Sequence, residues 1–143
     1  MNEGVKIPMW FTVAAVVAVL WDVMGVWAYI NTMTISAEDL IKMPEAERDI
    51  HNATPAWANG AFALAVFGGF IGSLLLLAKK SLALPVLIVS LIAVLVQMYN
   101  AFFIMDSIAV FGPGGMIMPI MIIVIASLLV WLAQIAKKKA WID

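Results

Sequence analysis

Four apolar runs, each about as long as a membrane-crossing helix, constrain this chain more than any motif does. They lie near residues 8–30, 55–78, 81–105 and 115–136. A helix needs roughly 20 apolar residues to cross the hydrocarbon core of a bilayer. The sequence therefore predicts an all-α polytopic membrane protein, a single domain over residues 1–143 with four transmembrane helices in a bundle.

The composition supports the same class and excludes several others. Of the 143 residues, 65% are hydrophobic and 12% are charged, whereas a soluble domain is about half apolar and a quarter charged. There is no cysteine and only one histidine, and no span holds paired carboxylates, which leaves little for metal binding or acid–base chemistry. We expect no metal, no cofactor and no enzymatic activity. The net charge of −1 without a basic patch also makes nucleic acid an unsuitable partner.

Local stop and start signals separate the runs. Thr54 followed by Pro55 is typical of a helix start, Lys79 and Lys80 mark a short turn, and the segment 111–115 reads FGPGG, a loop. The connection 31–54 is the long one, and it is acidic.

Within the connection 31–54, Ser36 resembles a helix cap, and Pro44 should interrupt the helix that begins there. We expect one or two short surface helices in this connection.

Lysine and arginine counts orient the spans. Six lysines fall on one side of a four-span arrangement, at Lys6, Lys79, Lys80 and 137–139, while the other side has only Lys42 and Arg48. Positively charged segments stay on the cytoplasmic side. Both termini are therefore expected in the cytoplasm, with the loop 31–54 outside.

Four polar side chains fall in the outer part of the spans. With a rise of about 1.5 Å per residue, Asp22 and Gln97 both come out roughly 12 Å below the outer boundary, at one level. Asn100 and Asn59 lie nearer that boundary, roughly 6–8 Å below it. We therefore predict an outward-opening polar pocket built from these residues.

Small residues form a stripe along the second span, at Ala61, Ala65, Gly68 and Gly72. Because lipid supplies no hydrophobic drive between helices, stripes of small residues mark close helix–helix contacts. The stripe is expected to pack within the subunit, against a second copy, or against a membrane partner. The fourth span is apolar nearly all round and is predicted to be the most lipid-exposed.

Asp22 is the residue that most needs an explanation. An ionised carboxylate in mid-span costs roughly 2.5–3.5 kcal/mol, so it requires a partner, a proton or water. The spans hold no Lys or Arg at its depth, and only Arg48 of the loop offers a salt bridge by folding down. One hypothesis is a protonated Asp22 that faces Gln97 and exchanges its proton during transport. The alternative is a purely structural aspartate.

A family resemblance accompanies these patterns. It is carried by Leu20-Trp21-Asp22-x-x-Gly25, by the long acidic connection 31–54, by Pro55-x-Trp57, and by AVFGG at 65–69 with Gly72 and LLLL at 74–77 before two lysines. This arrangement resembles a group of small bacterial four-span membrane proteins that sometimes carry the label "sugar transporter". The resemblance implies a location in the bacterial inner (plasma) membrane and a small solute as substrate.

Two functions are consistent with the residues. A small carrier or transport subunit explains the polar pocket around Asp22 and the close-packed second span. A non-catalytic accessory or assembly protein of the membrane explains the small size and the stripe, and leaves Asp22 structural. We favour the carrier, with the lipid bilayer as its surroundings.

Overall fold

A computed structural model describes residues 6–104 and 117–143 of the chain. The prediction of an all-α bundle with four spans is confirmed, because four of its helices are long and apolar enough to cross a membrane. The helices, in chain order, are α1 (Met9–Met33), α2 (Ala37–Lys42), α3 (Glu45–Ala53), α4 (Ala56–Leu77), α5 (Ala83–Tyr99), the π-helical turn η1 (Asn100–Ile104) and α7 (Ile117–Lys138). The predicted FGPGG loop at 111–115 lies outside the described residues.

The helix ends follow local chemistry. Pro85 and Pro119 lie in the first turns of α5 and α7, where their missing N–H groups break no helical bond. α1 continues to Met33 rather than ending at Ile30, and the hydroxyl of Thr34 bonds the carbonyl of Ile30 at its end.

The expectation of short helices in the acidic connection is confirmed. The Ser36 Oγ accepts a hydrogen bond from the backbone N–H of Asp39 at 3.1 Å and so caps α2. Pro44 then separates α2 from α3. Both helices are largely solvent-facing and contain no buried residue.

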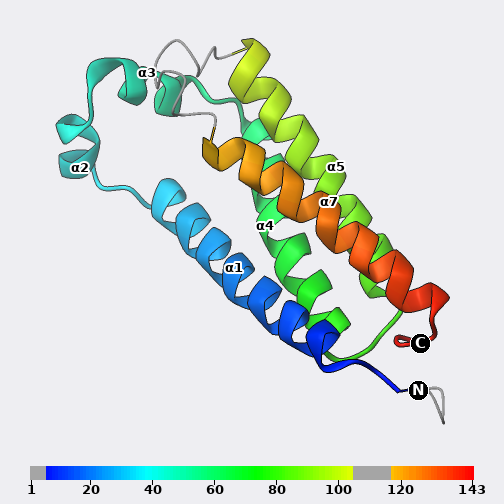
Figure 1. Cartoon of the computed structure of the whole chain (residues 1–143). Coiled ribbons are helices and arrows are strands. Elements are labelled where there is room, and N and C mark those ends of the chain that lie inside the picture. Colours follow the sequence, from blue (N-terminus) through cyan, green and yellow to red (C-terminus); the bar gives the residue numbers. More distant parts are fainter. Residues whose placement is uncertain (1–5, 105–116) are drawn as a thin grey trace.

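The four spans run alternately up and down, so both described termini lie at one end of the bundle and α2 and α3 lie at the other (Figure 1). We name these the terminal end and the loop end. In Figure 1, α4 and α5 lie behind, with α1 and α7 in front of them. α1 packs on α4, α4 on α5, and α5 on α7. The two front helices, α1 and α7, therefore pack less closely against each other than the other neighbouring spans do.

Two apolar clusters form the core, and α1 takes part in only one of them. The cluster in the terminal half includes Phe11 and Ala15 of α1 together with residues of α4, α5 and α7. The cluster in the loop half contains residues such as Ala65, Val94 and Ile122 from α4, α5, η1 and α7, and none from α1. The space between α1 and α7 is consequently filled at the terminal end and left open farther along.

The last residues fold back and lock the terminal end. The backbone N–H of Ser81 donates to the carbonyl of Asp143 at 2.7 Å, and the N–H of Asp143 donates to the carbonyl of Lys79 at 3.1 Å. Trp141 is buried and lies against Trp10 of α1, with 5.5 Å between ring centroids. The tail thus ties α1 to the turn between α4 and α5.

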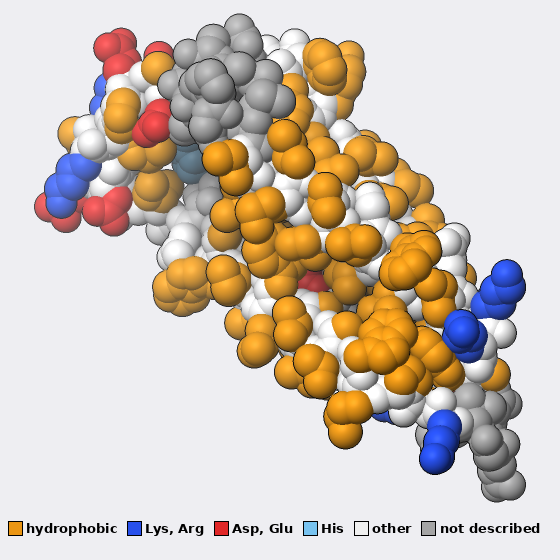
Figure 2. All heavy atoms as spheres, in the orientation of Figure 1, with side chains coloured by type: hydrophobic (Ala, Val, Ile, Leu, Met, Phe, Trp, Pro, Cys, Tyr) orange, Lys and Arg blue, Asp and Glu red, His pale blue; other side chains and the backbone are white. Residues whose placement is uncertain are grey.

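The surface of the spans is apolar, as a membrane requires. Figure 2 shows hydrophobic side chains over this face of the spans, with lysines at the terminal end and the acidic residues and other cations at the loop end. A multi-pass membrane protein follows from the four spans. The expectation that the fourth span is the most lipid-exposed is confirmed in part, because α7 shares the smallest buried fraction of the four spans with α1. Both α1 and α7 are exposed for the same reason, because each packs closely against only one other span: α1 against α4 and α7 against α5.

Candidate functional site

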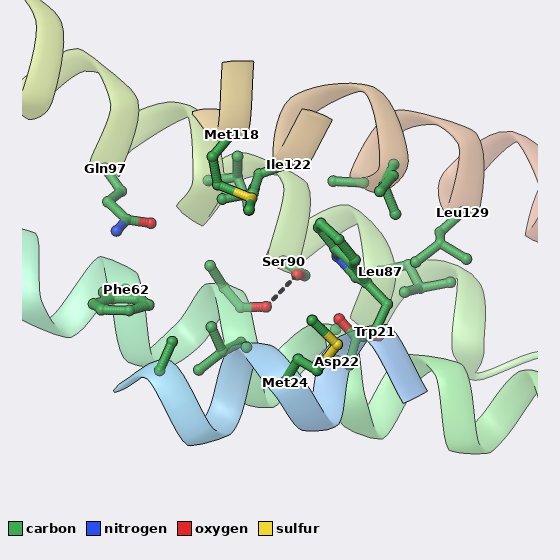
Figure 3. Close-up of a pocket in the computed structure, with 18 residues that line it drawn as sticks. Trp21, Asp22, Met24, Phe62, Leu87, Ser90, Gln97, Met118, Ile122 and Leu129 are labelled. Carbon is green, nitrogen blue, oxygen red and sulfur yellow. Dashed lines mark hydrogen bonds between the residues drawn. The ribbon is translucent and has the colours of Figure 1, made fainter. Parts of the chain in front are cut away.

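A cavity of about 300 Å³ lies between the four spans, and each of them contributes to its wall. Asp22 and Trp21 come from α1, Phe62 from α4, Ser90 and Gln97 from α5, and α7 supplies apolar side chains. Figure 3 shows these side chains around the space between the helices. The volume is within the range of small-molecule sites, at its lower end.

Asp22 is held on α1 against α4. The Ser73 Oγ donates a hydrogen bond to Asp22 Oδ2 at 2.6 Å, and Ser73 itself is fully buried. Asp22 retains 8% of its surface exposed, and that side of the residue lies on the cavity wall. The carboxyl therefore has one oxygen committed to the protein scaffold.

Gly69 makes this approach of α1 to α4 possible. A Cβ atom placed on Gly69 would lie 2.7 Å from Asp22 Oδ1 and 3.4 Å from Ser90 Oγ. The shorter distance is too small for any side-chain atom, so position 69 has to be glycine while Asp22 keeps this conformation. Ser73 lies one helical turn beyond Gly69 on the same face of α4. Gly69 thus leaves room for the Asp22 carboxyl on α4, and Ser73, four residues farther along, donates a hydrogen bond to it.

Two further glycines bring α4 against α5. A Cβ on Gly68 would meet the Ser90 Cβ at 3.2 Å, and one on Gly72 would meet the Leu87 Cδ2 at 2.6 Å. At this crossing the Ser90 Oγ donates to the carbonyl of Ala65 at 2.7 Å, the bond drawn in Figure 3. The small residues of α4 therefore allow two helices to pack closely against it. Gly68 and Gly72 face α5, and Gly69 faces α1.

The prediction that Asp22 faces Gln97 is wrong. Asp22 lies at the level of Ser90, as the shared approach to Gly69 shows, whereas Gln97 is seven residues farther along the same helix, roughly 10 Å at the usual rise. Figure 3 shows the two side chains at separate places on the wall, with Gln97 toward the loop end. The level was misjudged because it was measured from a predicted span end at residue 30, whereas α1 continues to Met33. Asp22 therefore lies deeper than the count predicted.

The two predicted asparagines are not part of the cavity wall. Asn100 is buried at the start of η1, and its Oδ1 atom has no hydrogen-bond partner in the described part of the chain. Asn59 is partly buried near the loop-end start of α4. Of the four predicted binding residues, the structure therefore brings Asp22 and Gln97 to one cavity and leaves Asn100 and Asn59 outside it.

The cavity also differs from the predicted pocket in its chemistry and in its opening. Of the 18 residues that line it, only Asp22, Ser90, Gln97 and the Trp21 indole carry hydrogen-bonding groups in their side chains. The pocket is mainly apolar, not polar. In Figure 2 an acidic side chain is visible in a recess of the apolar surface midway along the spans. Asp22 lines the cavity and is the one acidic residue of the described spans. The recess faces sideways, between α1 and α7.

Ser73, Ser90 and Gly69 are the residues of the site that sequence reasoning did not assign. Ser73 and Gly69 belong to a small-residue pattern that predicts packing equally well without a carboxyl nearby. A polar residue one turn from a glycine, on the helix next in the chain to Asp22, is the signal that could have identified them.

Comparison with protein-family models, with curated proteins and with solved structures finds no match. The site is therefore interpreted from its own chemistry. The described residues contain no group of three or more His, Cys, Asp and Glu side chains able to hold a metal ion. Within the described spans, the chemistry available is that of one carboxyl in an apolar chamber: it can accept hydrogen bonds, exchange a proton and attract positive charge.

Proposed function

We propose that this protein is a small carrier, or the transport subunit of one, whose solute occupies the cavity beside Asp22. The observation that supports this most directly is the cavity itself: about 300 Å³ of space lined by residues of all four spans, with the buried carboxyl on its wall. Membrane helices that serve only as an anchor gain stability by packing without such a gap, because each lost contact costs dispersion energy. The family resemblance implies the same class of function.

Asp22 is the group that would couple the solute to protons. A carboxyl in a membrane span can be neutral when enclosed and charged when water or a ligand reaches it. No other Asp, Glu, Lys, Arg or His from α4, α5 or α7 lines the cavity in the described part of the chain. Proton exchange in the cavity would therefore depend on this one residue.

The Ser73 hydrogen bond favours a second candidate function. A bond of 2.6 Å between α1 and α4 gives Asp22 a structural task that needs no solute. In that case the protein is an accessory or assembly factor of the membrane, and the cavity is an unfilled gap. The two functions differ in whether filling the cavity has any consequence other than a change in stability.

Uptake into proteoliposomes tests the carrier proposal. A panel of labelled small solutes is offered to liposomes that contain the purified protein, with a proton gradient in either direction. We expect at least one solute to be taken up, and Ala126→Phe on the cavity wall to slow that uptake by at least about tenfold, equivalent to 1.4 kcal/mol. Val124→Phe is the matched control, because Val124 is on the same helix and points to lipid.

Asp22→Asn separates the two functions. It keeps the shape and hydrogen bonding of the side chain but removes its titration. For a carrier we expect normal thermal stability with the pH dependence of uptake lost. Uptake that is unchanged by Ala126→Phe would contradict the role of the cavity, and absence of any uptake would favour the accessory function.

A further inference from the structure

The chemistry of the cavity selects among solutes. We propose that its ligand is a lipophilic primary ammonium ion, an apolar body carrying one –NH₃⁺ group that pairs with Asp22. This inference rests on the proposed function and names the substrate class for the same site.

The first argument is charge. Asp22 has no basic partner: no Lys, Arg or His of the described residues lines the cavity. Arg48, the residue considered for a salt bridge from the loop, instead donates from Nη1 to the carbonyl of Ile41 at 3.2 Å. An intramembrane carboxylate without a counter-charge is costly, so a cation that enters the cavity gains the ionic contact that the protein leaves unmade.

The second argument is the hydrogen bonding left free. Asp22 Oδ2 accepts the bond from Ser73, but no donor among the described residues bonds Oδ1. A charge-assisted N–H···O bond is short and strong. An ammonium group with N–H donors satisfies both the charge and this oxygen, whereas a quaternary ammonium satisfies only the charge.

The third argument is the wall. Apart from Asp22, Ser90 and Gln97 it consists of apolar and aromatic residues, and Trp21 and Phe62 are the aromatic ones. The recess opens sideways on the apolar surface of the spans (Figure 2). A ligand that partitions into the bilayer can therefore reach it.

The same wall argues against a sugar, the substrate that the family label suggests. A sugar presents several hydroxyl groups, and each needs a partner when it leaves water. The Ser90 hydroxyl already donates to the Ala65 carbonyl, and Gln97 is about two helical turns from Asp22. The described wall does not hold enough free polar groups around one point for such a ligand.

A matched set of ligands tests this inference on the purified full-length protein. The probe is 2-phenylethylammonium, and its binding is measured by titration calorimetry in detergent. The same phenylethyl body carrying a hydroxyl group, and carrying a trimethylammonium group, provides the two comparisons. We expect the primary ammonium to bind at least about tenfold more tightly than either, since both lose part of the charge-assisted contact.

Variants locate the probe in the cavity. Asp22→Asn should weaken 2-phenylethylammonium by at least about tenfold and leave the alcohol unchanged. Ala126→Phe should weaken all three ligands, and Val124→Phe none of them. Thermal unfolding of each variant checks that it is folded, and the comparison of ligands on the unaltered protein does not depend on any variant.

The outcomes separate this inference from the carrier proposal. Equal binding of the alcohol and the ammonium, or no binding of the ammonium at all, would overturn the ammonium class. Uptake of a different solute that responds to Ala126→Phe would still support the carrier. If neither Asp22→Asn nor Ala126→Phe changes the affinity for 2-phenylethylammonium, the ammonium site does not lie in this cavity. The uptake experiment in liposomes tests the carrier proposal separately.

Discussion

At the scale of single residues, the site depends on a position without a side chain. Gly69→Ala places a methyl group 2.7 Å from Asp22 Oδ1, which is too close. Asp22 then has to move away from Ser73, or α1 has to shift from α4. We expect a loss of about 1–3 kcal/mol in stability, the usual cost of overpacking. Thermal unfolding in detergent measures it.

Gly60→Ala is the matched control at this scale, because a Cβ there meets nothing within 4 Å and the position is exposed. It should leave stability unchanged or raise it slightly, since alanine favours helix over glycine. Equal thermal stability of Gly69→Ala and Gly60→Ala would mean that α4 tolerates a side chain at position 69, next to Asp22.

At the scale of helices, the pair α4 and α5 is the closely packed part of the bundle. Gly68→Ile together with Gly72→Ile would force large side chains against Ser90 and Leu87, whose atoms lie within 3.2 Å of the added Cβ positions. We expect separation of the helices, seen as a clear fall in detergent thermal stability or a change in particle size. Ile71→Leu, on the lipid side of α4, is the control. Unchanged stability and size in the double variant would show the stripe to be incidental.

At the scale of the whole molecule, both described termini lie at the terminal end of the bundle. The orientation in the membrane is therefore known once the side on which the terminal end lies is known. The six-to-two division of lysine and arginine predicts that the terminal end is cytoplasmic. Single cysteines at Glu38 in α2 and at Asp143, both exposed positions, should differ in intact cells: the first reacts with a membrane-impermeant maleimide and the second does not. After permeabilisation both should react. The opposite pattern would invert the orientation.

The sequence by itself determined the number of spans, their helical form and their approximate ends. Those properties depend on residues close in the chain: the length of an apolar run, a proline in a first turn such as Pro119, or a cap such as Ser36. It also identified Asp22 as a buried carboxyl without a basic residue at its depth. These features follow from the free energy of transferring each residue into lipid and from local backbone chemistry. They can therefore be predicted without knowing how the helices pack against one another.

Only the tertiary structure decided which groups Asp22 touches. The helical rise places residues along one axis, but it does not fix how far a neighbouring helix is shifted, tilted or rotated. Close packing at Gly68, Gly69 and Gly72 sets those quantities, and it brings Ser73 to Asp22 and leaves Gln97 two turns away. The side opening of the cavity has the same origin: α1 packs on α4 alone in the loop half, so nothing in the described part of the chain closes the space between it and α7.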